Sequence, residues 1–268
     1  MDTAKREIVI IDSKEDKDDP FSHITMCKEI LKACIPGIEP VCMEIGLDES
    51  GKGNIHELIL ALYNCLEKRP AVISLSIGSV RPSDFYCICS VIRQLVKSGV
   101  WITAALSNQG YLTIPASLPE VFGVIAENKL LDEPHLYNVQ TNGYGVDLCA
   151  SYKDMSDHGE SFNLRMVGNS FAVPVVAAAL YKRYIENIGS KKEVLELFPR
   201  KIIKWTEQMW KRHATELNDR PRVRFIGIDF SYQDWQRGFL YLAVRHKVEA
   251  VMESDFNEAE WDLHFIKN

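Results

Sequence analysis

The sequence contains no run of apolar residues long enough to cross a membrane, which takes about 18 consecutive ones. Its first residues lead through a short apolar segment into an acidic stretch, unlike a secretory signal with its longer apolar core. Basic residues are the minority: 31 Lys and Arg stand against 37 Asp and Glu, a net charge of −6. Phosphate binding needs a basic surface. We therefore expect a cytoplasmic protein whose partner is neither a membrane nor a nucleic acid.

The sequence also lacks residues at the spacing of a metal site. The seven cysteines are odd in number, and no group of Cys and His has the spacing of a zinc site. Most of them stand in apolar patterns, such as Cys27 after Met26 and Cys149 after Leu148, so we expect reduced core thiols without a disulfide framework. The acidic run at residues 15–19 matches no EF-hand loop and is interpreted as a solvated loop. We predict no metal and no cofactor.

An alternation of strand and helix patterns fills the first 190 residues. The segments that predict strands are Glu7–Asp12, Val41–Ile45, Ala71–Ile77, Val100–Leu106 and Val121–Ala126. The segments that predict helices are Thr25–Cys34, a stretch opened by Asn54 with Glu57 in capping-box position, a stretch from Ser83 to Lys97, and Phe171–Tyr184. This alternation predicts an α/β fold with a mostly parallel sheet of seven or so strands and helices on both faces.

The pattern changes after residue 190. Glu193–Leu217 is amphipathic but interrupted by Pro199, while Val223–Phe230 and Gly238–Val244 are typical of strands. No internal repeat or low-complexity linker is present. We predict a main domain over residues 1–206 and a C-terminal extension over residues 207–268, whose role the sequence does not reveal.

Four positions carry candidate chemistry, although each has an ordinary explanation when taken alone. Asp12 ends a strand, His23 stands near a helix start, Asn108 has the setting of a turn residue, and Ser170 is typical of a helix start. Asp12 and Asn108 stand at the carboxyl ends of predicted strands, which is where ligands bind in parallel sheets. Their order along the chain gives them a common interpretation.

Six blocks over roughly residues 7–206 resemble the subtilisin-like serine peptidases, in the order that this family has. They are Ile8–Ser13 around the acid, Ser22–Cys27 around the histidine, Ile73–Gly78, Ala104–Gly110 around the asparagine, Ile114–Val124, and Gly168–Pro174 around the serine. One match of this kind is weak evidence, but six in the same order indicate the family.

The resemblance implies a subtilisin-like three-layer fold and a catalytic triad. In it Ser170 is the nucleophile, His23 is the base, Asp12 orients the base, and Asn108 donates to the oxyanion. The residues expected to bind substrate are Ser76, Ile77, Gly78, Leu106, Ser107 and Asn169. Asn169 replaces the family's threonine and is still able to offer a hydrogen bond to the oxyanion.

The chain also departs from the family pattern. Asp12 and His23 are only 11 positions apart, so a loop that borders the substrate cleft is expected to be missing. Ile24 and Ser107 stand where the family has glycine, and the loop from Asn108 to Pro115 is short. We expect no propeptide ahead of the first strand. These features favour limited processing of a specific peptide or protein through an acyl-enzyme. The alternatives are a catalytically impaired pseudo-peptidase that acts as a peptide- or protein-binding module, and an esterase or transpeptidase with the same triad. The sequence does not indicate an oligomeric state.

Overall fold

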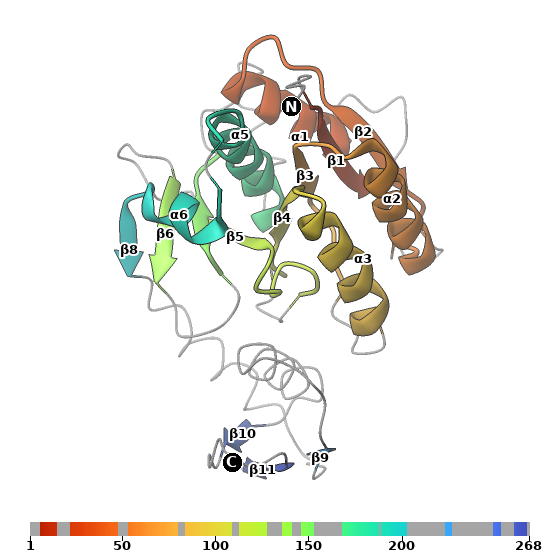
Figure 1. Ribbon diagram of the computed structural model, residues 1–268, viewed down its shortest axis with the longest axis vertical. Coiled ribbons are helices and arrows are strands. Elements are labelled where there is room, and N and C mark those ends of the chain that lie inside the picture. The colour runs from red at the N-terminus through yellow and green to blue at the C-terminus, as the bar shows by residue number, and fades with distance from the viewer. Residues whose placement is uncertain are drawn as a thin grey trace.

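A computed structural model describes twelve segments of the chain (Figure 1). They are residues 6–14, 22–47, 53–79, 84–108, 113–127, 136–140, 146–152, 168–187, 189–202, 223–226, 249–252 and 260–266. The acidic run at residues 15–19 and the predicted strand Gly238–Val244 lie outside them.

An eight-stranded sheet forms the centre of the molecule, with the strand order β2-β1-β3-β4-β5-β7-β6-β8. Its strands are β1 (Ile8–Ser13), β2 (Val41–Ile45), β3 (Val72–Leu75), β4 (Trp101–Ala105), β5 (Phe122–Ala126), β6 (Leu136–Gln140), β7 (Leu148–Ala150) and β8 (Arg200–Ile202). All neighbours pair in parallel except β6 and β7, which are antiparallel. The mostly parallel sheet predicted from the sequence is confirmed.

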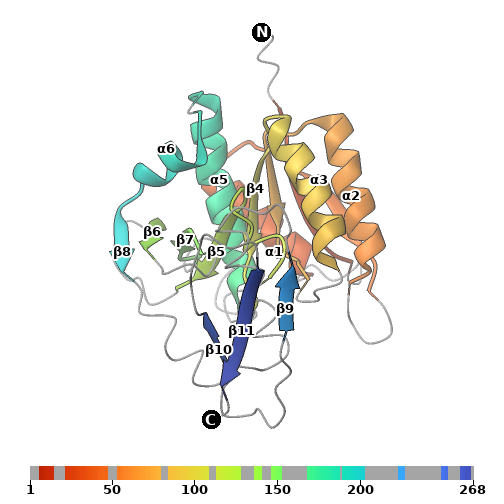
Figure 2. The ribbon, with the colours of Figure 1, turned by 60° about the horizontal axis from the view of Figure 1, so that its bottom comes forward.

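Two pairs of helices cover the two faces of this sheet. Helices α1 (His23–Cys34) and α5 (Ala172–Ile185) share one apolar cluster with Ile8 and Ile10 of β1. Helices α2 (Ile55–Lys68) and α3 (Phe85–Lys97) share the other cluster with Val9 and Ile11. Successive residues of a strand point to opposite faces, so β1 supplies both cores. The result is three layers, and Figure 2 shows α2 and α3 side by side on the same side of the sheet.

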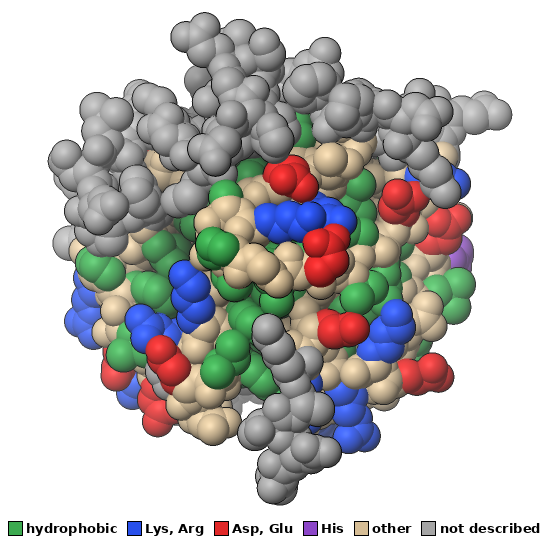
Figure 3. All heavy atoms as spheres, turned by 90° about the horizontal axis from the view of Figure 1, so that it is seen from above, with side chains coloured by type: hydrophobic (Ala, Val, Ile, Leu, Met, Phe, Trp, Pro, Cys, Tyr) green, Lys and Arg blue, Asp and Glu red, His purple; other side chains and the backbone are tan. Residues whose placement is uncertain are grey.

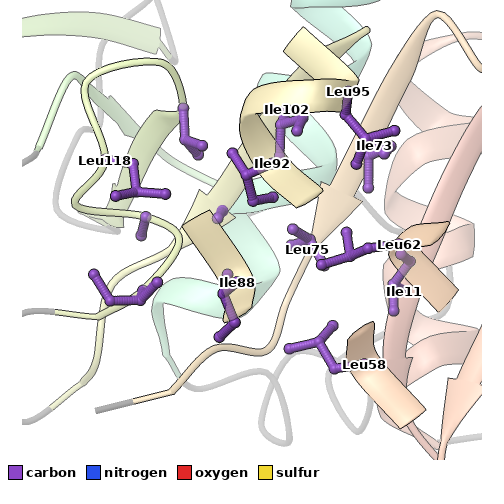
Figure 4. Packing of buried hydrophobic residues seen from close by; sticks show 14 of the residues in the cluster. Ile11, Leu58, Leu62, Ile73, Leu75, Ile88, Ile92, Leu95, Ile102 and Leu118 are labelled. Atoms are coloured by element: carbon purple, nitrogen blue, oxygen red, sulfur yellow. The ribbon is translucent and has the colours of Figure 1, made fainter. Parts of the chain in front are cut away.

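Strands β1, β3, β4 and β5 are mostly apolar because both faces of the sheet are covered there. Ile8, Val9, Ile10 and Ile11 are all fully buried. Burying one such side chain stabilises the fold by about 1.5–3 kcal/mol relative to leaving it exposed. In Figure 4, Ile73 and Leu75 of β3 point toward the side chains of α2 and α3. This packing fixes the strand ends that carry the polar residues described below.

Helix α2 begins as the sequence predicts, with one difference. The side chain of Asn54 accepts a hydrogen bond from the backbone N–H of His56 at 2.9 Å and so caps the helix. Glu57 was expected to complete a capping box with Asn54. Its Oε2 accepts instead from the backbone N–H of Gly46 at 2.6 Å, which ties the segment after β2 to the first turn of α2.

After residue 190 the structure describes the chain without a gap only as far as residue 202, so most of the amphipathic segment Glu193–Leu217 lies outside the described residues, while the interruption at Pro199 is visible. Helix α6 (Lys191–Glu196) is short, and Pro199 is followed by β8, which pairs with β6 at the end of the sheet. The cause is local, because proline cannot continue a helix and fits a strand start at the edge of a sheet. Strands β9 (Val223–Ile226), β10 (Glu249–Met252) and β11 (Glu260–Ile266) form a separate antiparallel sheet. The division at residues 206 and 207 stays a prediction.

The cysteines, the described helices and the charges on the described surface can be compared with the expectations from the sequence. All seven cysteines are free, and four of them are buried: Cys27, Cys65, Cys89 and Cys149. Among the described helices, none has both the length and the apolar character needed to span a bilayer. On the face seen in Figure 3, Lys and Arg side chains are interspersed with Asp and Glu, so the described part of that face carries no broad basic area.

Candidate active site

Asp12 and His23 are brought together by one strand and the helix that follows it. Asp12 is the fifth residue of β1 and is only 1% exposed, with its Oδ1 accepting from the Ser13 backbone N–H at 2.8 Å. His23 is the first residue of α1, which packs against β1. His23 Nδ1 lies 2.6 Å from Asp12 Oδ2. The short connection therefore does place the acid and the imidazole in contact, as the chain length allows.

Ser170 completes a line of three side chains. His23 Nε2 lies 2.8 Å from Ser170 Oγ, although the two residues are 147 positions apart. When Nδ1–H donates to Asp12, Nε2 is left as an acceptor for the Ser170 hydroxyl. The imidazole is 20% exposed, so it lies at the surface of the site while the carboxylate is buried beneath it. This is the arrangement in which a histidine can withdraw a proton from a serine.

The position of Ser170 is set by a short turn. Residues Asn169–Phe171 form a 3-10 turn that leads directly into α5. Ser170 is thereby held at the N-terminal end of a 14-residue helix. Backbone N–H groups and the positive end of the helix dipole favour negative charge at such a place. The helix that the sequence predicts from residue 171 thus begins one residue later, after this turn.

Two aromatic side chains, Phe171 and Tyr152, support the imidazole, and no pattern in the sequence singles them out. The ring centroids of Phe171 and His23 lie 4.3 Å apart with the planes tilted by 35°. Tyr152 packs edge-on against Phe171 at 5.7 Å, and its hydroxyl accepts from the Gly168 backbone N–H at 3.2 Å. Phe171 and Tyr152 are both buried. They restrict the motion of the imidazole from the side of α5.

A buried thiol lies beneath the acid and the base. Cys27 Sγ is 3.6 Å from His23 Nδ1 and 3.5 Å from Ser76 Oγ. Burial raises the pKa of Cys27 well above its ordinary value, and the negative charge of Asp12 raises it further, against a smaller lowering by the hydrogen bond with Ser76. The thiol is therefore protonated at neutral pH. Ser76 also donates from its hydroxyl to the carbonyl oxygen of Ser170 at 3.3 Å.

Asn108 stands at the end of the segment after β4 and faces the turn that carries the serine. Its Oδ1 accepts from the backbone N–H of Asn169 at 2.7 Å. Asn108 also lines the pocket next to Ser170. With its oxygen fixed in this way, the amide nitrogen is the part of the side chain left to donate to a ligand.

The pocket beside Ser170 has a volume of about 330 Å³, near the lower end of the range for ligand sites. It contains four of the six residues predicted to bind substrate: Ser76, Gly78, Leu106 and Ser107. Thr113 and Ala105 also line it and were not predicted. Ile77 instead packs against the core cluster of α2 and α3, and Asn169 is not among the lining residues.

The two residues that replace the family's glycines take different places. Ile24 is buried in the core shared by α1 and α5, so its bulk does not enter the pocket. Ser107 is a lining residue, and its backbone N–H donates to Thr113 Oγ1 at 2.8 Å. The short loop from Asn108 to Pro115 is described only at its ends, where Thr113 forms part of the pocket wall.

One group of side chains in the described ranges has the composition of a metal site. The ligand atoms of Asp12, His23 and Cys27 all lie within 4.8 Å of one another. Two of them already share a hydrogen bond of 2.6 Å, and the third is a protonated thiol. An ion bound there would replace the contact between the acid and the imidazole. The arrangement is that of a proton-transfer site, and we assign no metal to it.

Comparison with known proteins gives one curated relative and several related folds. The chain is 27% identical over 154 residues to the major intracellular serine protease of Bacillus subtilis (strain 168), a match that covers 54% of this chain and 47% of that protein. The chain thus spans about half the length of the curated relative that it matches. No protein-family model matches the sequence.

Among solved structures, the chain is similar to the epidermin leader peptide processing serine protease EpiP from Staphylococcus aureus. The TM-score is 0.52 at 15% identity, with 72% of this chain and 69% of that chain covered. A second structure of EpiP gives a TM-score of 0.51 with the same identity and coverage. The fold is therefore that of a serine peptidase. The relative from Bacillus subtilis bears out the resemblance to serine proteases that the sequence predicts, and the three-layer α/β architecture is confirmed.

Proposed function

We propose that this chain is a subtilisin-like serine endopeptidase that hydrolyses peptide bonds through an acyl-enzyme on Ser170. The observation that carries the proposal is the continuous line from Asp12 Oδ2 through His23 to Ser170 Oγ, with contacts of 2.6 and 2.8 Å. A serine hydroxyl is a weak nucleophile and needs a base in contact and a group that fixes the tautomer of that base. The contacts of His23 and Asp12 support both requirements.

The proposed reaction begins when Ser170 Oγ attacks the carbonyl carbon of the scissile bond. Its proton passes to His23 Nε2, while Asp12 holds Nδ1–H and stabilises the imidazolium. The negative charge that develops on the carbonyl oxygen receives hydrogen bonds from Asn108 Nδ2 and the Ser170 backbone N–H. His23 then returns the proton to the leaving amine. Water repeats the sequence on the acyl group and restores the Ser170 hydroxyl.

The pocket lined by Ser76, Gly78, Leu106 and Ser107 is proposed to hold the residue before the scissile bond. Its position supports this role, because it lies next to Ser170 and includes the oxyanion donor Asn108. Substrate backbone is proposed to extend along Ser76, Ile77 and Gly78, the segment that follows β3. No cofactor is required for this chemistry.

We further propose limited processing of a specific peptide or protein inside the cell. The 11-residue connection from Asp12 to His23 leaves little chain to border a broad cleft. The name of the Bacillus relative places that protease inside the cell, and we extend the location to this chain. Cleavage of casein as rapid as that by a digestive protease would contradict the limited-processing part of the proposal.

Labelling with a fluorophosphonate probe tests the catalytic part of the proposal. The probe reacts with serines that are activated by a base, so the wild-type chain is expected to be labelled and Ser170→Ala is not. Absence of labelling in the wild type would instead support the non-catalytic peptide-binding alternative. Mass spectrometry of the products formed from a cleaved peptide separates hydrolysis from transpeptidation.

A further inference from the structure

The side chain of Asn169 joins three backbone groups at the ends of two neighbouring strands. Its Nδ2 donates to the carbonyl oxygen of Leu106 at 3.0 Å and to that of Ser107 at 3.4 Å, just after β4. Its Oδ1 accepts from the backbone N–H of Ala126, the last residue of β5, at 2.9 Å. A single amide thus connects the turn that carries Ser170 to the carboxyl ends of β4 and β5.

The backbone of the same residue holds the second catalytic candidate. The Asn169 N–H donates to Asn108 Oδ1 at 2.7 Å, and this contact orients the Asn108 amide. Ser170 is the next residue in the chain. Any displacement of Asn169 therefore moves the nucleophile and the oxyanion donor relative to each other.

A direct role for the Asn169 side chain at the oxyanion is not what the contacts favour. The amide has two N–H hydrogens, and two carbonyl oxygens lie within reach of its nitrogen. Its oxygen is bonded to Ala126. The residue is also absent from the lining of the pocket beside Ser170. The side chain is directed at the backbone of the sheet.

We propose that Asn169 is a positioning residue, which locks the Ser170 turn to β4 and β5 and so sets the spacing between Ser170 and Asn108. The inference rests on the proposed function. Asparagine suits the task because it supplies two donors and an acceptor from one short side chain. Aspartate has nearly the same shape but only acceptors, and threonine has a single donor. Replacing Asn169 by aspartate or threonine therefore tests the role, because each replacement removes donors from the side chain.

The test compares Asn169→Asp with wild type in the rate of fluorophosphonate labelling of Ser170. In Asn169→Asp, a carboxylate oxygen faces the carbonyl oxygens of Leu106 and Ser107, and the turn is pushed away from the strand. A misplacement of about 1 Å at reacting groups costs on the order of 10²-fold in rate. We expect a loss of about 10- to 100-fold in the maximal labelling rate, with a much smaller change in the probe concentration needed for half of it.

A matched control comes from a second asparagine that is distant from the site. Asn138 Nδ2 donates to the Leu195 carbonyl oxygen at 2.7 Å, so Asn138→Asp makes the same chemical change. We expect Asn138→Asp to lower the melting temperature and to label at the wild-type rate. Asn169→Thr, which keeps one donor, is expected to fall between wild type and Asn169→Asp, and it replaces the latter if Asn169→Asp does not fold. Labelling of these Asn169 variants within twofold of wild type would overturn the proposal.

Hydrogen exchange at the Ala126 amide provides a readout that does not depend on reactivity. The amide donates to Asn169 Oδ1, so Asn169→Ala is expected to increase its exchange rate at least tenfold, while Asn138→Ala leaves it unchanged. Unchanged exchange in Asn169→Ala would overturn the positioning role. If the wild-type chain is not labelled by the probe, the proposed function fails, and exchange at Ala126 still decides whether Asn169 locks the turn.

Discussion

Gly168 lies directly against the side chain of Asn108. A Cβ atom built on Gly168 would be 2.7 Å from Asn108 Nδ2, closer than real Cβ atoms approach a neighbour, and 3.0 Å from Oδ1, which is tighter than most real contacts. The φ angle of Gly168 is +130°, a conformation that other residues rarely adopt. Both the space and the backbone therefore require glycine at the position that precedes the serine turn.

Gly168→Ala is expected to displace the Asn108 amide from the oxyanion position. Losing one oxyanion donor typically costs about 10²- to 10³-fold in rate. We predict a loss of that size in fluorophosphonate labelling of Ser170. Gly37→Ala is the control, because Gly37 has φ of +81° but nothing within 4 Å of an added Cβ. It should lower stability slightly and leave labelling unchanged; equal labelling of both variants would count against the role of Asn108.

Asp12→Asn removes the charge that stabilises the imidazolium while it keeps the shape of the side chain. The amide is also able to donate to Nδ1 and so to favour the wrong tautomer of His23. In the corresponding substitution of a serine-protease triad the rate falls by about 10⁴-fold, and we expect a loss of about 10³- to 10⁴-fold here. Labelling kinetics provide the measurement. Asp147→Asn makes the same change in a carboxylate that is bonded to Lys191 and to the Gly123 backbone, and it should retain the wild-type labelling rate.

Stability is predicted to fall at alkaline pH because buried thiols resist ionisation. Burial raises the pKa of Cys65 from 9.0 to about 11. Below pH 9 the thiol is protonated in both states. Between pH 9 and about 11 the unfolded chain loses the proton and the folded chain keeps it, so folding stability decreases as pH rises. The slope for this group is at most about 1.4 kcal/mol per pH unit. Urea unfolding across this range is expected to show a shallower slope in Cys65→Ala.

Lys191 anchors α6 to the segment before β5. Its Nζ donates to the carbonyl oxygens of Pro119 and Val121 at 2.8 and 2.6 Å and to Asp147 Oδ2 at 2.7 Å. Lys191→Met removes these bonds and leaves a half-buried carboxylate. Hydrogen bonds to charged groups contribute about 1.5–3 kcal/mol, so we expect a loss of about 2 kcal/mol in the free energy of unfolding. The adjacent exposed Lys192→Met should change stability by less than about 0.5 kcal/mol.

The central strands could be predicted because they are buried on both faces. The segments that become β1 to β5 are mostly apolar, and their bounds agree with the prediction to within two residues. Strands β6, β7 and β8 were not predicted as strands. Each is short or polar: β7 has three residues, and β8 is the sequence Arg-Lys-Ile after Pro199. Such segments become strands through their neighbours in the sheet, which local pattern does not reveal.

The sequence also indicated which side chains meet, but not what supports them. Asp12, His23 and Ser170 stand in recognisable blocks, and the structure brings them into contact. Phe171 and Tyr152 looked like ordinary apolar residues, because their contacts with His23 and with each other depend on tertiary packing. The hydrogen bonds of the Asn169 side chain could not be predicted from the sequence either, because they join residues that are 43 to 63 positions apart.

The order of the catalytic candidates along the chain has a consequence during translation. The acid and the base leave the ribosome together in one strand–helix unit, but the serine follows 147 residues after the histidine. For most of its synthesis the nascent chain therefore has a proton acceptor without a nucleophile. The hydroxyl arrives with α5, which must dock on α1 before the three side chains can meet. Under the proposed function, an unfinished chain is therefore unable to cut itself or its neighbours before α5 has docked.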